Sequence, residues 1–223
     1  MADDKPVLRL AESALADAVN LLGIPTNTLS ALACRWFHRR AQTAKDVLLD
    51  ELSRGEFRPL EVAEQDEAFG MIVRYMAAAR DGRARLNLRL LASLIHGVIA
   101  DVAPLQAENF HRFAPLLEDL SHEEVFLLAR LISYQEDRAE SVEGEIDEEQ
   151  TPWQQALSVL VPDYFPTVEH LKSVAASASR TGFLELSSGF DVHYNPSPLL
   201  DDLRRYVGFE DALRKEGLQD LIH

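Results

Sequence analysis

Arginines form the densest positive run of the chain, and they are the first residues whose type and spacing suggest a binding chemistry. Guanidinium groups bind carboxylates and phosphates through paired N–H donors, so one hypothesis is an anion or phosphate-backbone site. The other is a set of salt bridges between helices, in which cations near a helix C-terminus also suit the helix dipole. Both interpretations stay open for the five residues of the run, which are Arg74, Arg80, Arg83, Arg85 and Arg89.

The other residues that could do chemistry give no recognisable motif. The 7 histidines have no metal-site spacing, and the sequence contains none of the common phosphate-loop, dinucleotide, zinc-protease or serine-hydrolase motifs. Cys34 is the single cysteine, which excludes a disulfide within one chain. It stands among apolar residues, so we expect a packed, unreactive thiol. We therefore predict a non-catalytic protein with no metal and no cofactor.

The charge of the chain is unevenly distributed. Residues 1–100 carry 13 Lys/Arg and 13 Asp/Glu, whereas residues 101–223 carry 9 and 24, so the second half accounts for the whole net charge of −15. Nonspecific affinity for nucleic acid comes mainly from basic side chains that displace counterions from phosphates. The charge of the second half therefore disfavours a nucleic-acid partner, although a local basic patch can override it.

The stretch from Thr167 to Pro198 predicts a compact module of helix, hairpin and helix. Thr167 is placed as an N-cap, and Gly182 follows the last residue of a helical apolar pattern. The period then changes to two, as in β-strands, with turn residues in the middle of the segment. Pro198 is placed as the first residue of a further helix, 199–207.

Two more helical stretches, Glu123 to Gln135 and Pro152 to Leu160, precede this module. The complete order, over roughly residues 121–207, resembles a winged helix-turn-helix domain. The resemblance implies that the helix Thr167 to Arg180 is the recognition helix and that the hairpin Phe183 to Tyr194 is the wing. It leaves open both uses of such domains, which are reading DNA and docking proteins.

The polar side of this recognition helix is the candidate site. Its lysine, arginine and serines suit phosphates, and His170 and Ser177 suit base edges. Glu169 lowers the positive charge, and no Lys or Arg occurs at the hairpin tip, so we favour a protein partner over DNA. The candidate recognition face consists of His170, Lys172, Ser173, Ser177 and Arg180.

The first half of the chain predicts a helical bundle. Apolar residues occupy nearly every direction between Ala84 and Ile99, which is typical of a central helix. Arg85 and Arg89 should then lie at an edge or pair with carboxylates, because a buried unpaired guanidinium is costly. Trp36 beside basic residues could also indicate a helix on a membrane surface, but neighbouring carboxylates favour the bundle. This half faintly resembles uncharacterised bacterial helical proteins, to which no activity can be attached.

An acidic run from Glu136 to Gln150 interrupts the second half. It has too few apolar residues to bury, so we expect a disordered, solvated insertion. The alternative is that it mimics nucleic-acid charge or occupies a basic partner.

These observations predict a mainly α protein, with a helical bundle over residues 1–120 and a winged-helix-like domain with one short β-hairpin over 121–223. The beginning of the sequence lacks a signal-peptide pattern and no apolar run could span a membrane, so we expect a cytoplasmic location. The expected function is that of an interaction or regulatory protein, with a protein partner or self-association. The alternative is a dimeric DNA-binding transcriptional regulator. A membrane surface is disfavoured as a partner.

Overall fold

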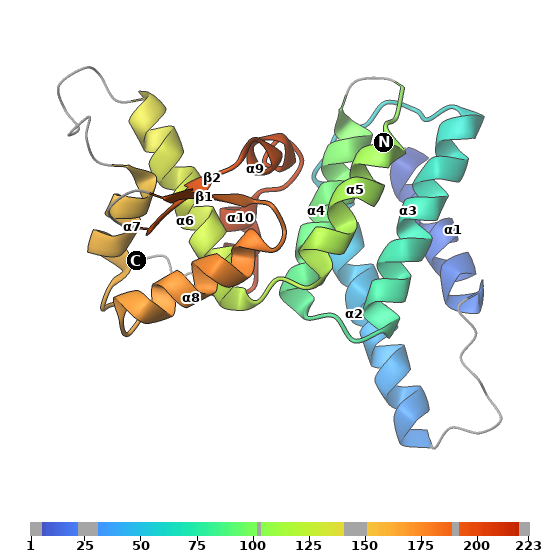
Figure 1. Cartoon of the computed structure of the whole chain (residues 1–223). Helices are drawn as coiled ribbons and strands as arrows, with labels where there is room; N and C mark the ends of the chain where they lie inside the picture. The colour runs from blue at the N-terminus through green and yellow to red at the C-terminus, as the bar shows by residue number, and fades with distance from the viewer. Residues whose placement is uncertain (1–5, 22–30, 102–103, 141–150, 189–191, 219–223) are drawn as a thin grey trace. The chain divides into compact units, whose positions relative to one another are not determined.

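The computed structural model describes residues 6–21, 31–101, 104–140, 151–188 and 192–218 (Figure 1). This part of the chain is mainly helical and contains a single β-hairpin, as the sequence predicts. It divides into two compact units, Met1–Asp119 and Leu120–His223. Each unit is described by itself.

The described part of unit 1 is built from helices, and the range of α4 agrees with the apolar stretch Ala84 to Ile99 to within one residue. The helices are α1 (Pro6–Leu21), α2 (Ala31–Ser53), α3 (Val62–Arg80), α4 (Arg85–Ala100) and α5 (Ala107–Glu118). Cys34 belongs to α2, but its side chain lies outside the described ones.

Helix α4 is the centre of unit 1, and the prediction that it is central is confirmed. It packs against α2, α3 and α5, and its side chains are buried on nearly every side. Arg89 is among them, with a side chain only 6% exposed. Its Nη1 lies 2.8 Å from Asp50 Oδ2 and 3.8 Å from Glu51 Oε2 on α2, so the buried cation is paired as expected. Partial burial opposes ionisation of Asp50, but hydrogen bonds from Arg89 and Arg54 bring the pKa of this carboxyl below its usual value.

A buried carboxylate connects three segments of unit 1. Glu64, in the first turn of α3, accepts hydrogen bonds from the backbone N–H of Glu61 and of Leu105, both at 2.9 Å. Arg58, in the connection between α2 and α3, donates Nη1 to Glu64 Oε2 at 2.7 Å. The bonds from Arg58, Glu61 and Leu105 lower the pKa of Glu64 from 4.5 to about 2. The carboxylate therefore ties the α2–α3 connection and the chain before α5 to the start of α3.

Unit 2 contains five helices and the hairpin among its described residues. The elements are α6 (His122–Glu140), α7 (Pro152–Leu160), α8 (Val168–Ser179), β1 (Leu184–Ser188), β2 (Val192–Pro196), α9 (Pro198–Leu203) and α10 (Phe209–Lys215). Helix α6 packs against α7, α8 and α10, with Val125, Leu127, Leu128 and Leu131 fully buried. Ser121 and Glu124 form a capping box at the start of α6, since each backbone N–H bonds to the other side chain.

The hairpin is closed at its base by a buried serine. The strands are antiparallel, with Leu184 opposite Pro196 and Ser188 opposite Val192. Ser197, at the N-cap of α9, donates its hydroxyl to Gly182 O at 2.6 Å and its N–H to Phe183 O at 2.9 Å. These bonds fix the start of α9 to the chain that follows α8.

Three boundaries differ from the sequence prediction. Helix α6 continues to Glu140, beyond the expected end at Gln135, because the acidic run begins with good helix formers and places Arg138 in the last turn. The rest of that run, 141–150, lies outside the described residues. Helix α9 ends at Leu203 because the chain turns before Gly208, which lets both Val207 and Phe209 reach the core. The sequence pattern also indicates a helical tail from Phe209 to Ile222, but the final helix ends at Lys215, and residues 219–223 lie outside the described ones.

Replacing Glu64 by Gln should make unit 1 less stable near neutral pH, by an amount that shrinks in acid. The folded-state pKa lies below the unfolded one, so the stabilisation is complete above pH 4.5 and is lost as the pH falls towards 2. Urea unfolding of the wild type and of Glu64→Gln between pH 7 and about 2.5 measures this difference. Glu67→Gln, at an exposed position of the same helix, is the control. A difference independent of pH would contradict the role of the carboxylate.

Candidate interaction face

Helix α8 carries the candidate recognition face, and its own sequence fixes which side is exposed. The Thr167 hydroxyl accepts the N–H of His170 at 3.1 Å and so caps the helix. Leu171, Val174, Ala175 and Ala178 are buried, and α8 packs against α6 and β1 (Figure 1). The opposite side is therefore left to solvent.

The structure brings four of the five predicted residues onto one side of α8. His170, Ser173, Ser177 and Arg180 follow one another at spacings of three and four, so they form a single stripe. Ser173 and Ser177 are exposed. Lys172 is partly buried and points in another direction, because two residues of helix correspond to more than half a turn.

The two basic members of the stripe lie against carboxylates of the first turn of α6. His170 Nε2 is 3.3 Å from Glu123 Oε1. Arg180 Nη1 is 3.1 Å from Glu124 Oε1, and Arg180 also donates to Ser177 O. The stripe therefore presents paired charges and two serines, with little net positive charge.

Glu124 explains why Arg180 is held in this position. Its side chain is only 3% exposed, and its Oε2 accepts the backbone N–H of Ser121 at 2.6 Å. A buried carboxylate is costly without partners. Arg180, half-exposed, supplies a guanidinium at the border between the buried carboxylate and solvent. Arg180 thus has a structural task that its place in the sequence did not reveal.

The hairpin next to α8 carries exposed apolar residues. Leu186 and Val192 are 60% and 40% exposed. The register puts both on the side of the hairpin that also holds Leu184 and Tyr194, which are buried, so an apolar surface continues from the core out along the hairpin. The described strand residues include no lysine or arginine. The tip, 189–191, lies outside the described residues.

The arginine run of unit 1 is divided between the interior and different surface positions. Arg89 is the buried partner of Asp50. Arg74 Nη2 lies 3.2 Å from Glu118 Oε1, and Arg80 Nε lies 3.1 Å from Asp81 Oδ1. For these three residues the geometry agrees with the salt-bridge interpretation.

The remaining two arginines of the run, Arg83 and Arg85, lie beside each other in the α3–α4 turn and at the start of α4. Arg83 pairs with Asp119 and lies 3.9 Å from Glu118 Oε2, whereas Arg85 is exposed. Both line one small cavity together with Arg40, which the sequence analysis did not connect with them. The five predicted residues are therefore not one surface.

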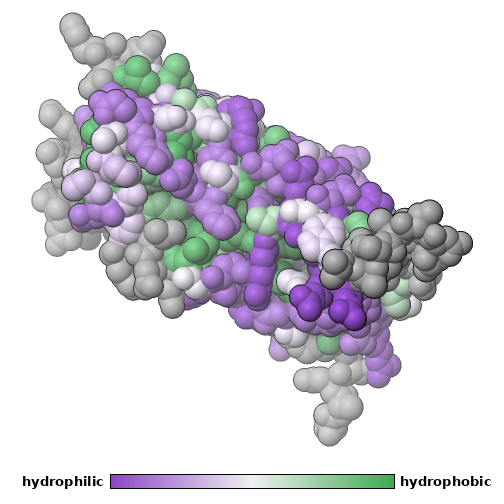
Figure 2. All heavy atoms as spheres, turned by 90° about the horizontal axis from the view of Figure 1, so that it is seen from below, coloured by the Kyte–Doolittle hydropathy of each residue, from purple (hydrophilic) through white to green (hydrophobic). Residues whose placement is uncertain are grey.

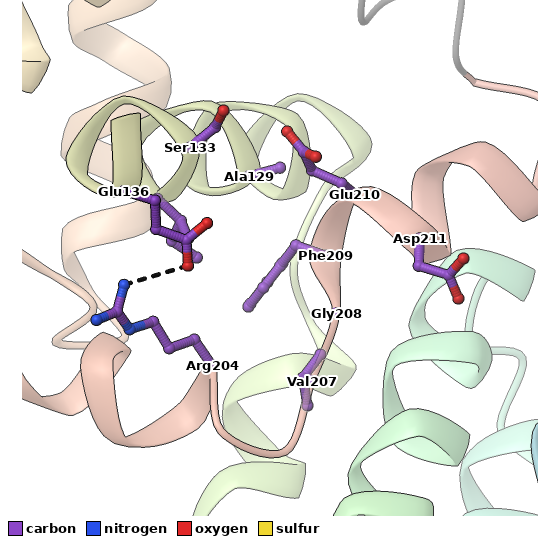
Figure 3. Close-up of a pocket in the computed structure, with 10 residues that line it drawn as sticks. Ala129, Ser133, Glu136, Arg204, Val207, Gly208, Phe209, Glu210 and Asp211 are labelled. Atoms are coloured by element: carbon purple, nitrogen blue, oxygen red, sulfur yellow. Dashed lines mark hydrogen bonds and ion pairs between the residues drawn. The ribbon is translucent and has the colours of Figure 1, made fainter. Parts of the chain in front are cut away.

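A second small cavity, of about 180 Å³, lies in unit 2 between α6 and the turn before α10. Figure 3 shows Arg204 facing Glu136 at its border, with Nη1 to Oε1 at 3.4 Å, and the ring of Phe209 turned towards it. Glu210 adds another carboxylate, and the wall includes Ser133 but no histidine. The cavity is acidic and offers no paired nucleophile and base.

One face of the molecule is mainly polar. The face seen in Figure 2 is covered mainly by hydrophilic side chains with smaller hydrophobic areas between them. No helix within the described residues is long and apolar enough to cross a membrane. The described part of the chain also contains no group of three or more His, Cys, Asp or Glu side chains placed to hold a metal ion.

No protein-family model matches the chain, and comparisons with curated proteins and with solved structures give no match. The resemblance to winged helix-turn-helix domains therefore stays a prediction.

Replacing Arg180 by Met should destabilise unit 2 by about 1 to 2 kcal/mol, because Glu124 stays buried without its guanidinium. In the Glu124→Gln background the same change should cost less, and chemical unfolding of the four proteins of this double-mutant cycle measures the coupling. Arg205→Met, at an exposed position, should change stability by less than about 0.5 kcal/mol. Equal costs of Arg180→Met in both backgrounds would show that the pair is not coupled.

Proposed function

We propose that this chain is a non-catalytic interaction or regulatory protein, whose unit 2 is a winged-helix-like module that binds another protein. The order α6, α7, α8, hairpin and α9 supports the module, with α8 in the place of the recognition helix and β1–β2 in that of the wing. The function depends on what the exposed side of α8 and the hairpin offer to a partner.

The observation that carries the proposal is the pairing of His170 and Arg180 with Glu123 and Glu124. A helix that reads DNA needs cations free to approach phosphates, because that contact supplies most of the affinity. Here Glu124 compensates Arg180 and Glu123 lies beside His170, and both carboxylates would repel a phosphate backbone. Ser173 and Ser177 remain as neutral hydrogen-bonding groups, which suit a protein surface.

The hairpin supports the same conclusion. Leu186 and Val192 expose apolar area on one side of the strands, and an apolar centre surrounded by polar groups is typical of protein interfaces. A wing that enters the minor groove of DNA would instead use basic side chains. The hairpin and the α8 stripe are thus the surfaces on which we expect the protein partner, which includes a second copy of the chain.

A labelled mixed-sequence DNA duplex should show no binding in fluorescence anisotropy at tens of micromolar protein and low salt. The measurement is repeated near physiological salt, where counterion release would weaken any true DNA contact steeply. Lys172→Glu tests the lysine of α8 and leaves the pair of Arg180 and Glu124 intact, whereas Arg180→Glu would break that pair. Binding that is strong at low salt, falls with salt and is weakened by Lys172→Glu would replace the proposal with the DNA-regulator alternative.

A photo-crosslinking amino acid at Leu186 should give a defined protein adduct in cells that express the chain. The same amino acid at Glu185, exposed on the opposite side of β1, is the matched control and should give much less. The adduct from position 186 should be lost when Val192→Asp is added, and circular dichroism checks that the variants are folded. An adduct mass of two chains would identify self-association. Equal labelling from positions 185 and 186, or no adduct from 186, would contradict the proposed surface.

A further inference from the structure

A cavity in unit 1 brings together three arginines at the turn between α3 and α4. Its volume is about 180 Å³, below the roughly 300 to 1,000 Å³ typical of sites for drug-sized ligands. Arg40 comes from α2, whereas Arg83 and Arg85 come from the turn and from the first position of α4. The cavity is lined by Arg40, Thr43, Gly82, Arg83, Ala84, Arg85 and Leu88.

Arg40 is a cation without a carboxylate partner among the described residues. Its Nε donates to Ala79 O at 2.9 Å, and its Nη2 donates to Arg83 O. Its guanidinium also lies 5.0 Å from the ring centroid of Trp36. A guanidinium has five N–H donors, so these two bonds fix the orientation of the group and leave donors for an acceptor in the cavity. Its charge is compensated only by carbonyl oxygens and an aromatic ring.

Two carboxylates hold the terminal nitrogens of Arg83. Its Nη1 pairs with Asp119, and its Nη2 lies 3.9 Å from Glu118 Oε2. Its Nε is buried and has no hydrogen-bond acceptor in the part of the chain that the structure describes. This atom has almost no accessible surface, so Arg83 contributes positive charge to the wall of the cavity and not a hydrogen bond through Nε.

The backbone of the turn adds a third favourable feature. Gly82 has φ +95°, which favours glycine, and the N–H groups of Gly82 and Arg83 bond to the carbonyls of Ala79 and Ala78. The chain then enters α4 at Ala84, which has no side-chain cap for the N–H groups of the first turn. The start of this helix therefore lies at the wall of the cavity and brings the positive end of its dipole there.

The carboxylates near the cavity form ion pairs with neighbouring arginines. Glu118 and Asp119 are engaged with Arg74 and Arg83, and Asp81 lies against Arg80. No Asp or Glu lines the cavity itself, whereas Thr43 adds a hydroxyl that suits a tetrahedral oxyanion. The cavity thus combines fixed cations, a hydroxyl and a helix start, and its size fits one phosphate group.

We infer that this cavity is a binding site for a phosphate group, either free inorganic phosphate or the end of a larger phosphorylated small molecule. Arg40 supplies the main charge and its remaining N–H donors, Thr43 supplies a hydrogen bond, and Arg83 and Arg85 add positive charge to the wall. The inference is independent of the proposed function, because it concerns unit 1 and a different kind of ligand.

Titration of the full isotope-labelled chain with inorganic phosphate, followed by amide NMR spectra at constant ionic strength, tests the site. We expect saturable shifts at residues 82–88 with millimolar affinity. Arg40→Gln should weaken binding at least tenfold, the effect of losing about 1.4 kcal/mol of charge-assisted hydrogen bonding. Arg39→Gln, at the adjacent exposed position of α2, should leave the affinity unchanged.

Parallel titrations separate the sources of the phosphate group and keep the test decisive. Glycerol phosphate that binds more tightly than inorganic phosphate would identify a phosphomonoester as the better ligand, whereas equal affinity would indicate the free ion. Sodium chloride at the same ionic strength should give no saturable shifts at residues 82–88. If Arg40→Gln does not fold, Thr43→Val is the second variant. It removes only a hydroxyl from the wall and should also weaken phosphate binding. Absence of saturable shifts at about 50 mM of either ligand, or equal weakening by Arg39→Gln and Arg40→Gln, would overturn the inference.

Discussion

Unit 1 depends on a buried carboxylate at the beginning of a helix. Glu64 takes hydrogen bonds from a guanidinium and from two backbone N–H groups, and these donors come from segments before α3, at its start and before α5. A carboxylate in such a place is tolerated only when its oxygens are satisfied, so each donor is required once the residue is buried. Two connections that have no regular structure of their own are thereby fixed to the helical core.

Unit 2 also contains a buried carboxylate at the start of a helix, and there it affects the surface that we propose for binding. Glu124 occupies the corresponding third position of α6, with Ser121 at the N-cap and Arg180 as the guanidinium partner. Because Arg180 serves this buried oxygen, it is not available as an independent cation on the α8 stripe. The need of the buried Glu124 for a cationic partner thus lowers the net positive charge of the surface that a partner would contact. Arg40 of unit 1 differs from Arg180, because backbone carbonyl groups orient it and no carboxylate among the described residues pairs with it.

Local signals in the sequence were sufficient for the elements and for some of their contacts. The all-round apolar pattern located α4, and Thr167 marked the N-cap of α8. Contacts between distant segments could not be predicted from the sequence, because helical periodicity shows which side of a helix is buried but not which residue packs against it. Arg180 and Glu124 are 56 residues apart, and Arg40 reaches a turn 43 residues further along the chain. The arginine run looked like one patch because its members are close in sequence, whereas the fold buries Arg89 against Asp50 and leaves Arg74 and Arg83 beside Glu118.

The bonds of Glu64 also differ in how far they reach along the chain. The donors Glu61 and Arg58 are 3 and 6 residues away, whereas Leu105 is 41 residues away. Closing a short loop costs little chain entropy, so the first two bonds can form as soon as α3 begins to form. The bond from Leu105 can form only after α4 has formed and returned the segment before α5 to the start of α3. We therefore expect the bonds from Arg58 and Glu61 to form early in folding. The bond from Leu105 should form last of the three, when unit 1 is complete.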